Sequence, residues 1–388
     1  MKLNLIRTKV LLALIACLVI GVAGIVALMQ YSFTRNADAL AAESVTAAQR
    51  LFMILEAREI SKMSAVADML IANDEVLDAV ASRDRPRLLA LTGPMYLELK
   101  KQGITNWMFH TPEAGMPVFL RLHNPTLFGD QLNRFMDKEI QRTHAPVEGN
   151  ELARAGFAVR VIEPLTNAQG KQLGYVEFGE EIGQFIHTMK QQTGDDYGLL
   201  LSKRYVDRQF WSQSNAILKR RDNWNDNPRF VVADKTTPSD SIIKFDGDLG
   251  AVHAEGSVLE RFHDGNAIFV RGIFPLHDAA GNSVGAMFVV HDISATYVAM
   301  RGTRNILVLV TVATLSLGMF LVLTLLDRLV FRRLDRIIRI ATRVVGGDYE
   351  SNIHVSSEDE VGQIELLFEQ FRCVFVDVLS HVPELMGK

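Results

Sequence analysis

Charge is missing from two long stretches of this 388-residue chain, Val10–Thr34 and Asn305–Leu326. Each stretch is long enough to cross about 30 Å of hydrocarbon as a helix. The first exceeds the roughly 7–15 apolar residues of a cleaved signal peptide, and no clear cleavage site follows it. Basic residues lie at the outer ends, namely Lys2, Arg7 and Lys9 before the first stretch and Arg328, Arg332, Arg333, Arg336, Arg339 and Arg343 after the second. Because basic flanks stay in the cytoplasm, the pattern predicts two membrane spans with both termini inside.

Cysteine is nearly absent, since Cys17 lies in the first uncharged stretch and Cys373 lies near the far end. The segment between the two stretches has none, so it must fold on its own core without disulfides. A formal net charge of −4 does not suggest nucleic acid as a partner. The sequence also lacks the His-Glu-x-x-His and Gly-x-x-x-x-Gly-Lys motifs. We therefore expect no enzyme and no cofactor.

Glycine and proline are missing from residues 25–85. Apolar residues there recur at helical spacing, at Val45, Ala48, Phe52, Leu55, Ile60, Met63, Ala67 and Leu70. The first span is therefore predicted to continue outside the membrane as one long helix, over residues 34–74. The apolar stripe suits packing on the domain that follows or on a partner helix, and the sequence leaves both open.

A hairpin pattern occurs twice after this helix. Residues 159–182 match residues 270–293 without a gap, with identity at nine of 24 positions. The shared residues in the first copy are Val159, Arg160, Ile162, Pro164, Leu165, Ala168, Gly170, Gly174 and Ile182. In each copy a glycine-containing turn separates two apolar runs, which is typical of a β-hairpin. The repeat predicts two related α+β modules, 75–190 and 191–300.

Each module has further predicted elements. In the first module these are strands over 104–110, 118–123, 159–165 and 173–178, and a helix over 130–142. In the second module they are strands over 199–202, 230–233, 267–274 and 284–290, and a helix that starts near Ser294 and runs into the second span.

Heptad spacing appears beyond Leu326. Leu334, Ile337, Ala341 and Val344 are spaced 3-4-3, and Val361, Ile364, Phe368, Phe371, Phe375 and Val378 are spaced 3-4-3-4-3. Two heptad helices joined by a short connector cannot bury their apolar seams in a monomer. The pattern therefore predicts a parallel, dimeric four-helix bundle.

This cytoplasmic end resembles a HAMP domain over residues 327–376. The resemblance rests on the order basic flank, helix, Gly347-Asp348, connector, Asp359-Glu360-Val361-Gly362 and Phe368. It implies a role in signal relay for Arg333, Gly347, Asp348, Glu360, Gly362 and Phe368. The family usually has a proline where this chain has Arg333, and that proline helps to set the angle at which the membrane helix enters. Residues 10–33 and 305–326 are then the spans, and residues 1–9 and 377–388 are cytoplasmic tails.

The external part, residues 36–300, resembles the double Cache sensor domain of chemotaxis receptors and sensor histidine kinases. The resemblance rests on the long helix, on the two PAS-like modules and on the stretch from Phe119 to Asp130, which contains Arg121, His123 and Pro125. In that family the membrane-distal module usually holds the ligand. The resemblance therefore implies a pocket in the first module, residues 75–190.

Strand alternation suggests which side chains line such a pocket. Phe119, Arg121 and His123 share one face of their predicted strand, opposite an apolar face. We expect a pocket for a small organic anion or amino acid, with Arg121 pairing the ligand carboxylate. Further candidates are Trp107, His110, Asp130 and Arg160. His110 and His123 together are too few ligands to favour a metal site.

The alternative is that Arg121 and Arg160 form structural ion pairs with Asp130, Glu163 or Glu177. Arg271 occupies the position of Arg160 in the second module, which favours a structural role for Arg160.

These features together predict a receptor of the bacterial inner membrane. It would be a homodimer with a periplasmic sensor domain that relays a small-molecule signal through HAMP to a cytoplasmic effector on a separate chain. Relatives usually continue into a methyl-accepting coiled coil, a kinase or a cyclic-dinucleotide enzyme. A non-signalling solute-binding or scaffold protein and a truncated receptor therefore stay open as alternatives.

Overall fold

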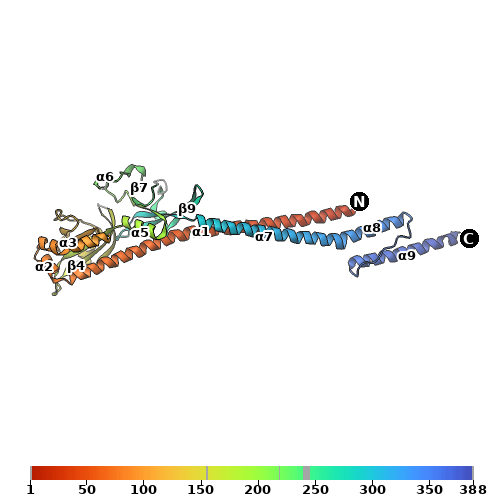
Figure 1. Cartoon of the computed structure of the whole chain (residues 1–388), viewed down its shortest axis with the longest axis horizontal. Helices are drawn as coiled ribbons and strands as arrows, with labels where there is room; N and C mark the ends of the chain where they lie inside the picture. Colours follow the sequence, from red (N-terminus) through yellow and green to blue (C-terminus); the bar gives the residue numbers. More distant parts are fainter. Residues whose placement is uncertain (1, 154–155, 218, 239–244, 387–388) are drawn as a thin grey trace. The chain divides into compact units, whose positions relative to one another are not determined.

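The chain divides into two compact units in the computed structural model, which describes residues 2–153, 156–217, 219–238 and 245–386 (Figure 1). The sheet unit is Asn36–Val298, and the helix unit combines Met1–Arg35 with Ala299–Lys388. Of the two predicted tails, Met1 and residues 387–388 lie outside the described residues.

Helix α1 (Lys2–Ile71) contributes the predicted apolar stripe to the core of the sheet unit. Phe52, for example, is 4% exposed, and its ring lies 5.9 Å from that of Phe185 and 6.0 Å from that of Phe274. Phe274 belongs to the second module, and the same core also contains Trp107 and Phe178 of the first. The stripe therefore packs on both modules of its own chain, which is the first of the two arrangements that the sequence left open.

The first module is a five-stranded antiparallel sheet with the strand order β2-β1-β5-β4-β3. Its elements are α2 (Asp74–Ala81), α3 (Arg85–Lys101), β1 (Asn106–His110), β2 (Val118–Arg121), α4 (Phe135–Thr143), β3 (Val147–Ala153), β4 (Gly156–Thr166) and β5 (Gln172–Glu181). Helix α4 starts later than the predicted Asp130, because residues 122–134 form an irregular loop in which the Asp130 side chain pairs with Arg121.

The second module repeats this topology in the order β7-β6-β10-β9-β8. Its elements are α5 (Gly183–Thr193), β6 (Asp196–Ser202), α6 (Arg208–Ile217), η1 (Trp224–Asp226), β7 (Phe230–Lys235), η3 (Leu249–Ala251), β8 (Ser257–Asp264), β9 (Ala267–His277) and β10 (Ser283–Asp292). The prediction of two α+β modules is therefore confirmed at the level of the sheets. The sequence missed β3 and β8, each of which forms one of the two edges of its sheet.

The repeated hairpins have the same register in both sheets. Leu165 pairs with Gly174 in the first sheet, and Leu276 pairs with Gly285 in the second. A Cβ atom at Gly174 would overlap the His110 carbonyl oxygen, and one at Gly285 would overlap that of Leu200. The shared glycine is therefore explained by the close approach of the neighbouring strand in each sheet.

In the helix unit, α7 (Ser294–Leu326) continues into one turn of π-helix, η4 (Asp327–Phe331), and then into α8 (Arg332–Val345). Helix α9 (Glu360–Met386) follows a connector without regular structure. Two helical segments, Arg7–Ile71 and Ser294–Val345, are long and apolar enough to cross a membrane by length and composition.

Candidate functional site

The residues predicted to form a pocket in the first module lie on both faces of its sheet. Trp107 is fully buried in the core that contains α1, with its ring 4.9 Å from that of Phe178. His110 stands three residues further along the same strand, so its side chain lies on the opposite face. Trp107 and His110 therefore do not meet in one pocket.

Arg121 forms the ion pair that the sequence offered as its alternative role. Its guanidinium donates to both carboxylate oxygens of Asp130 at 2.7 and 2.9 Å, and to the carbonyl oxygen of Leu127 at 2.8 Å. Phe119 lies half-buried beside Arg83, whose guanidinium carbon is 5.8 Å from the ring centre. His123 is exposed just beyond β2. The Arg121 guanidinium, which was expected to bind a ligand carboxylate, thus binds the carboxylate of Asp130 instead.

Arg160 belongs to a buried charge cluster around Glu177, a residue with no exposed surface. The Glu177 carboxylate is bonded by Arg160 Nη1 at 2.7 Å, by Arg134 Nη2 at 2.6 Å and by His110 Nε2 at 2.9 Å. Burial would raise the pKa of Glu177, but Arg134, His110 and Arg160 together hold this pKa well below its usual value. The Glu177 carboxylate is therefore fully engaged by groups of its own chain.

Two members of this cluster were missed by sequence reasoning. Arg134 precedes α4, where its side chain also pairs with Asp137 at 2.8 Å, and Glu151 lies on the unpredicted strand β3, 3.4 Å from Arg134 Nε. Burial raises the pKa of Glu151. Neither residue could be identified from the sequence. Arg134 lies in an irregular loop and Glu151 on a polar edge strand, and neither segment has a pattern that predicts where its side chains point.

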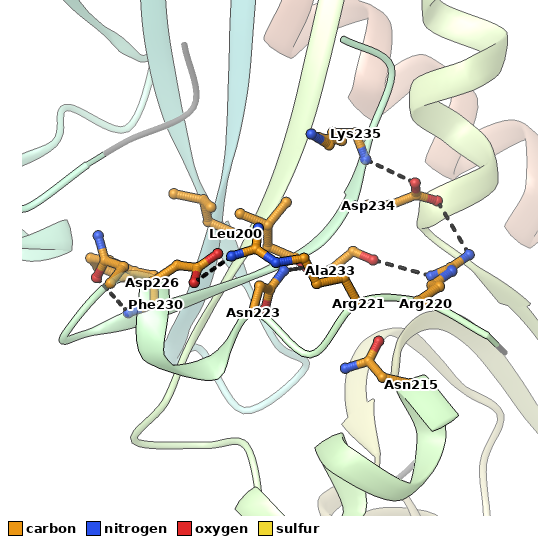
Figure 2. A pocket seen from close by; sticks show the side chains of 12 residues that line it. Leu200, Asn215, Arg220, Arg221, Asn223, Asp226, Phe230, Ala233, Asp234 and Lys235 are labelled. Carbon is orange, nitrogen blue, oxygen red and sulfur yellow. Dashed lines mark hydrogen bonds and ion pairs between the residues drawn. The ribbon is translucent and has the colours of Figure 1, made fainter. Parts of the chain in front are cut away.

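The second module contains a cavity of about 680 Å³ on β6 and β7 (Figure 2). Its apolar floor includes Leu200 and Phe230. Helix α6 contributes Asn215, and the polar residues that line the rest are Arg220, Arg221, Asn223, Asp226, Asn227, Asp234 and Lys235. This volume suits a small organic ligand, since such sites typically enclose about 300–1,000 Å³.

Charges of both signs line this cavity. Figure 2 shows Arg221 paired with Asp226, at 2.9 Å, and Arg220 directed toward Asp234, with 4.0 Å between Nη2 and the carboxylate. Arg220 also donates to the Ala233 carbonyl oxygen at 3.2 Å. Both arginine side chains stay about half exposed or more, at 49% and 68% for Arg220 and Arg221, so they are accessible to a ligand.

Two buried amide atoms in the cavity lining have no hydrogen-bond partner among the described residues, namely Nδ2 of Asn215 and Oδ1 of Asn223. The other end of the Asn223 amide donates to the Val232 carbonyl oxygen at 2.8 Å. A buried polar atom without a partner is costly, so these two atoms provide a donor and an acceptor for a bound molecule.

The sequence did not indicate this cavity, because it lies in a segment without a counterpart in the first module. Residues 203–229, with α6 and η1, connect β6 to β7, where the first module has only the short turn 111–117 between β1 and β2. A run rich in Arg, Asn and Asp, such as 220–227, is indistinguishable from a surface loop in the sequence.

Within the described parts of the chain, no three His, Cys, Asp or Glu side chains are grouped to hold a metal ion. His110 contacts Glu177 and the Met116 carbonyl oxygen instead.

The residues expected to relay a signal lie on α8, on α9 and in the connector between them. Arg333 on α8 donates to Asp359 at 2.7 Å and to Glu365 at 2.9 Å, and Glu365 is fully buried. Gly347 and Asp348 follow the end of α8, whereas Glu360, Gly362 and Phe368 belong to the first half of α9. Arg333 thus connects the two helices within one chain.

Comparison with known proteins gives one family and several similar folds. The family described as the double sensory domain of two-component sensor kinase matches residues 54–297. No curated protein sequence matches the chain.

The similar solved structures are sensor domains at low identity. The periplasmic domain of Vibrio cholerae LuxQ is 10% identical, with a TM-score of 0.37 and coverage of 66% of this chain and 99% of that chain. The ligand-binding domain of the Campylobacter jejuni chemoreceptor Tlp3, in complex with L-valine, is 8% identical, with a TM-score of 0.38 and coverage of 68% and 96%. The sensor domain of the V. cholerae histidine kinase DctB is 12% identical, with a TM-score of 0.39 and coverage of 66% and 98%.

Proposed function

This chain belongs to the family of double sensory domains of two-component sensor kinases, and we propose that it is a membrane receptor for a small organic acid or amino acid. The two apolar helical segments and the basic flanks support a multi-pass protein of the bacterial inner membrane, with the sheet unit in the periplasm. A receptor role needs a ligand site and a relay, and each is supported by its own observation.

The observation that carries the ligand site is the second-module cavity with its two unpartnered amide atoms. A carboxylate suits Arg220 and the Asn215 amide, and an ammonium or hydroxyl group suits the Asn223 oxygen and Asp234. Binding through Arg121 in the first module would instead require the Arg121–Asp130 pair to break. The cavity is therefore the better candidate for the site.

The relay is proposed to pass through residues 327–376 as a HAMP domain in a homodimer. In a single chain, Ile364, Phe371, Phe375 and Val378 on α9 are 40–65% exposed, which supports a second copy as the partner of this face. Ligand binding would bias two packings of this bundle only by its different affinity for the two states. The signal then reaches a cytoplasmic effector.

A ligand screen followed by two matched variants tests this proposal. A thermal-shift screen of residues 36–298 against organic acids and amino acids is expected to find a stabilising compound. Arg220→Gln should then weaken its binding by about 10–100-fold, the loss expected for one hydrogen bond to a charged group. Arg121→Gln should leave the affinity unchanged.

The reverse result, loss of affinity in Arg121→Gln alone, would place the ligand in the first module. A screen in which no acid or amino acid stabilises the protein would remove the support for this ligand class.

A further inference from the structure

Two buried carboxyl groups meet where α1 contacts the first-module sheet. Glu59 on α1 is 5% exposed and Glu180 on β5 is 7% exposed. Both approach the same ammonium group, that of Lys62. The Lys62 Nζ pairs with Glu59 and lies 3.5 Å from Glu180 Oε2, and it also donates to the Gln102 carbonyl oxygen at 2.9 Å. One ammonium group, on a side chain that is 26% exposed, thus serves two buried carboxylates.

The remaining groups that face the pair come from α1 and from the connection between α3 and β1. On α1, Arg58 donates to Glu59 Oε1 at 2.8 and 3.0 Å, and its own side chain is 61% exposed. Between α3 and β1, the backbone at Gly103 packs directly on the Glu180 carboxylate. A Cβ atom at residue 103 would overlap that carboxylate, so the site is closed by backbone on this side.

Other acidic groups at the same helix–sheet interface are placed differently. Glu56 on α1 accepts a hydrogen bond from Asn150 at 2.6 Å, and Glu163 on β4 lies near Ser64 and Asp68 of α1. Burial raises the pKa of both Glu56 and Glu163. Neither shares a cation with a second buried carboxylate, so Glu59 and Glu180 stand apart at this interface.

We propose that Glu59 and Glu180 form a proton-operated contact between α1 and the first module, so that the receptor responds to periplasmic pH as well as to its ligand. With one shared proton, the two carboxyl groups hydrogen-bond to each other and hold α1 against β5. When that proton leaves, two negative charges face each other across the interface, with the Lys62 ammonium between them and Arg58 bonded to Glu59 alone. The contact then weakens.

The energetics agree with this geometry. Burial and the neighbouring Glu59 raise the pKa of Glu180 to about 7. Burial would also raise the pKa of Glu59, but Lys62 and Arg58 lower it below its usual value, so the proton resides on Glu180. Because the pKa of Glu180 is higher in the folded state, its contribution to stability is complete below pH about 4.5 and is lost as the pH rises through about 7.

Hydrogen exchange of the full-length protein in lipid nanodiscs tests the contact. Peptides covering residues 55–66 should lose protection between pH 5 and pH 7, with an opening constant that rises by about tenfold per pH unit after correction for intrinsic exchange and levels off above pH about 7. In Glu180→Gln, which mimics the protonated acid, the opening constant should stay flat over the same range. Glu98→Gln, an exposed change on α3 of the same module, should follow the wild type.

Glu59→Gln supplies an independent check should Glu180→Gln fold poorly, because it also removes one charge of the pair. Its opening constant should be equally independent of pH over the same range. A flat profile in the wild type would overturn the proposal, as would an unchanged pH dependence in both glutamine variants.

Discussion

Removal of the Glu177 charge is the sharpest test of how the first module is built. In Glu177→Gln the side chain keeps its size, but Arg160 and Arg134 lose the carboxylate that bonds them at 2.7 and 2.6 Å. Among the residues that the structure describes, Arg160 then retains Glu151 as its acidic partner, at 3.7 Å. Removing one partner of a buried ion pair typically costs about 3–5 kcal/mol, because the remaining charge stays buried without compensation.

The loss should be visible as a lower melting temperature of residues 36–298. For a chain of this size, about 3–5 kcal/mol corresponds to a decrease of about 6–20 °C, measured by calorimetry or circular dichroism at pH 7. Glu98→Gln removes an exposed carboxylate of the same module, in a pair with Lys101, and should shift the melting temperature little.

A second variant tests whether the loss of stability comes from an unpaired buried charge or from altered packing. Replacing Glu177 by Gln and Arg160 by Met together removes the carboxylate and also the cation that it would leave without a close partner, while Arg134 keeps its pairs with Asp137 and Glu151. The double variant should therefore be more stable than Glu177→Gln alone, because breaking a buried ion pair costs most when one charge is left behind. If Glu177→Gln costs less than about 1 kcal/mol, the cluster is hydrated and the reasoning from buried charge is wrong.

Three further outcomes follow from other parts of the structure. Gly285→Ala should destabilise residues 36–298 by about 1–3 kcal/mol in urea unfolding, because its new Cβ meets a strand carbonyl, whereas Gly250→Ala, with 3.6 Å of space, should not. Phe52→Ala should cost about 3–5 kcal/mol in the same assay, and the exposed neighbour change Met53→Ala should cost less than about 0.5 kcal/mol. Arg333→Gln should speed amide exchange at the start of α9 in the full-length protein, and unchanged exchange would show that its bonds to that helix are dispensable.

The sequence predicted the parts of the fold that depend on local patterns. The hairpins over 159–182 and 270–293 were predictable because strand alternation and turn residues lie within a few positions of each other. The edge strand β8 was not, because most of its residues are exposed and polar, so alternation does not distinguish it from a loop.

The candidate site was less accessible to such reasoning. Arg121 and Arg160 were identified as charged groups on strands, with ion pairs as their alternative role, but no pattern in one sequence says whether a guanidinium will face a ligand or a carboxylate of its own chain. The cavity depends on how the connection 203–229 lies over the second sheet, a long-range arrangement that periodicity does not describe.

The shared register of the two hairpins has a consequence for folding fidelity. Two segments with the same turns and nine identities compete for the same strand partners while the chain folds, as related modules in tandem do. One pair of equivalent positions in the two hairpins differs in chemistry. Glu177 lies opposite Ile162 in the first sheet, and Phe288 lies opposite Ile273 in the second. A hairpin β4–β5 inserted into the second sheet would carry Arg160 with it, but it would place the Glu177 carboxylate beside Phe245 and away from Arg134 and His110, at a cost of several kcal/mol. The Glu177 carboxylate therefore disfavours pairing of the first hairpin in the wrong sheet.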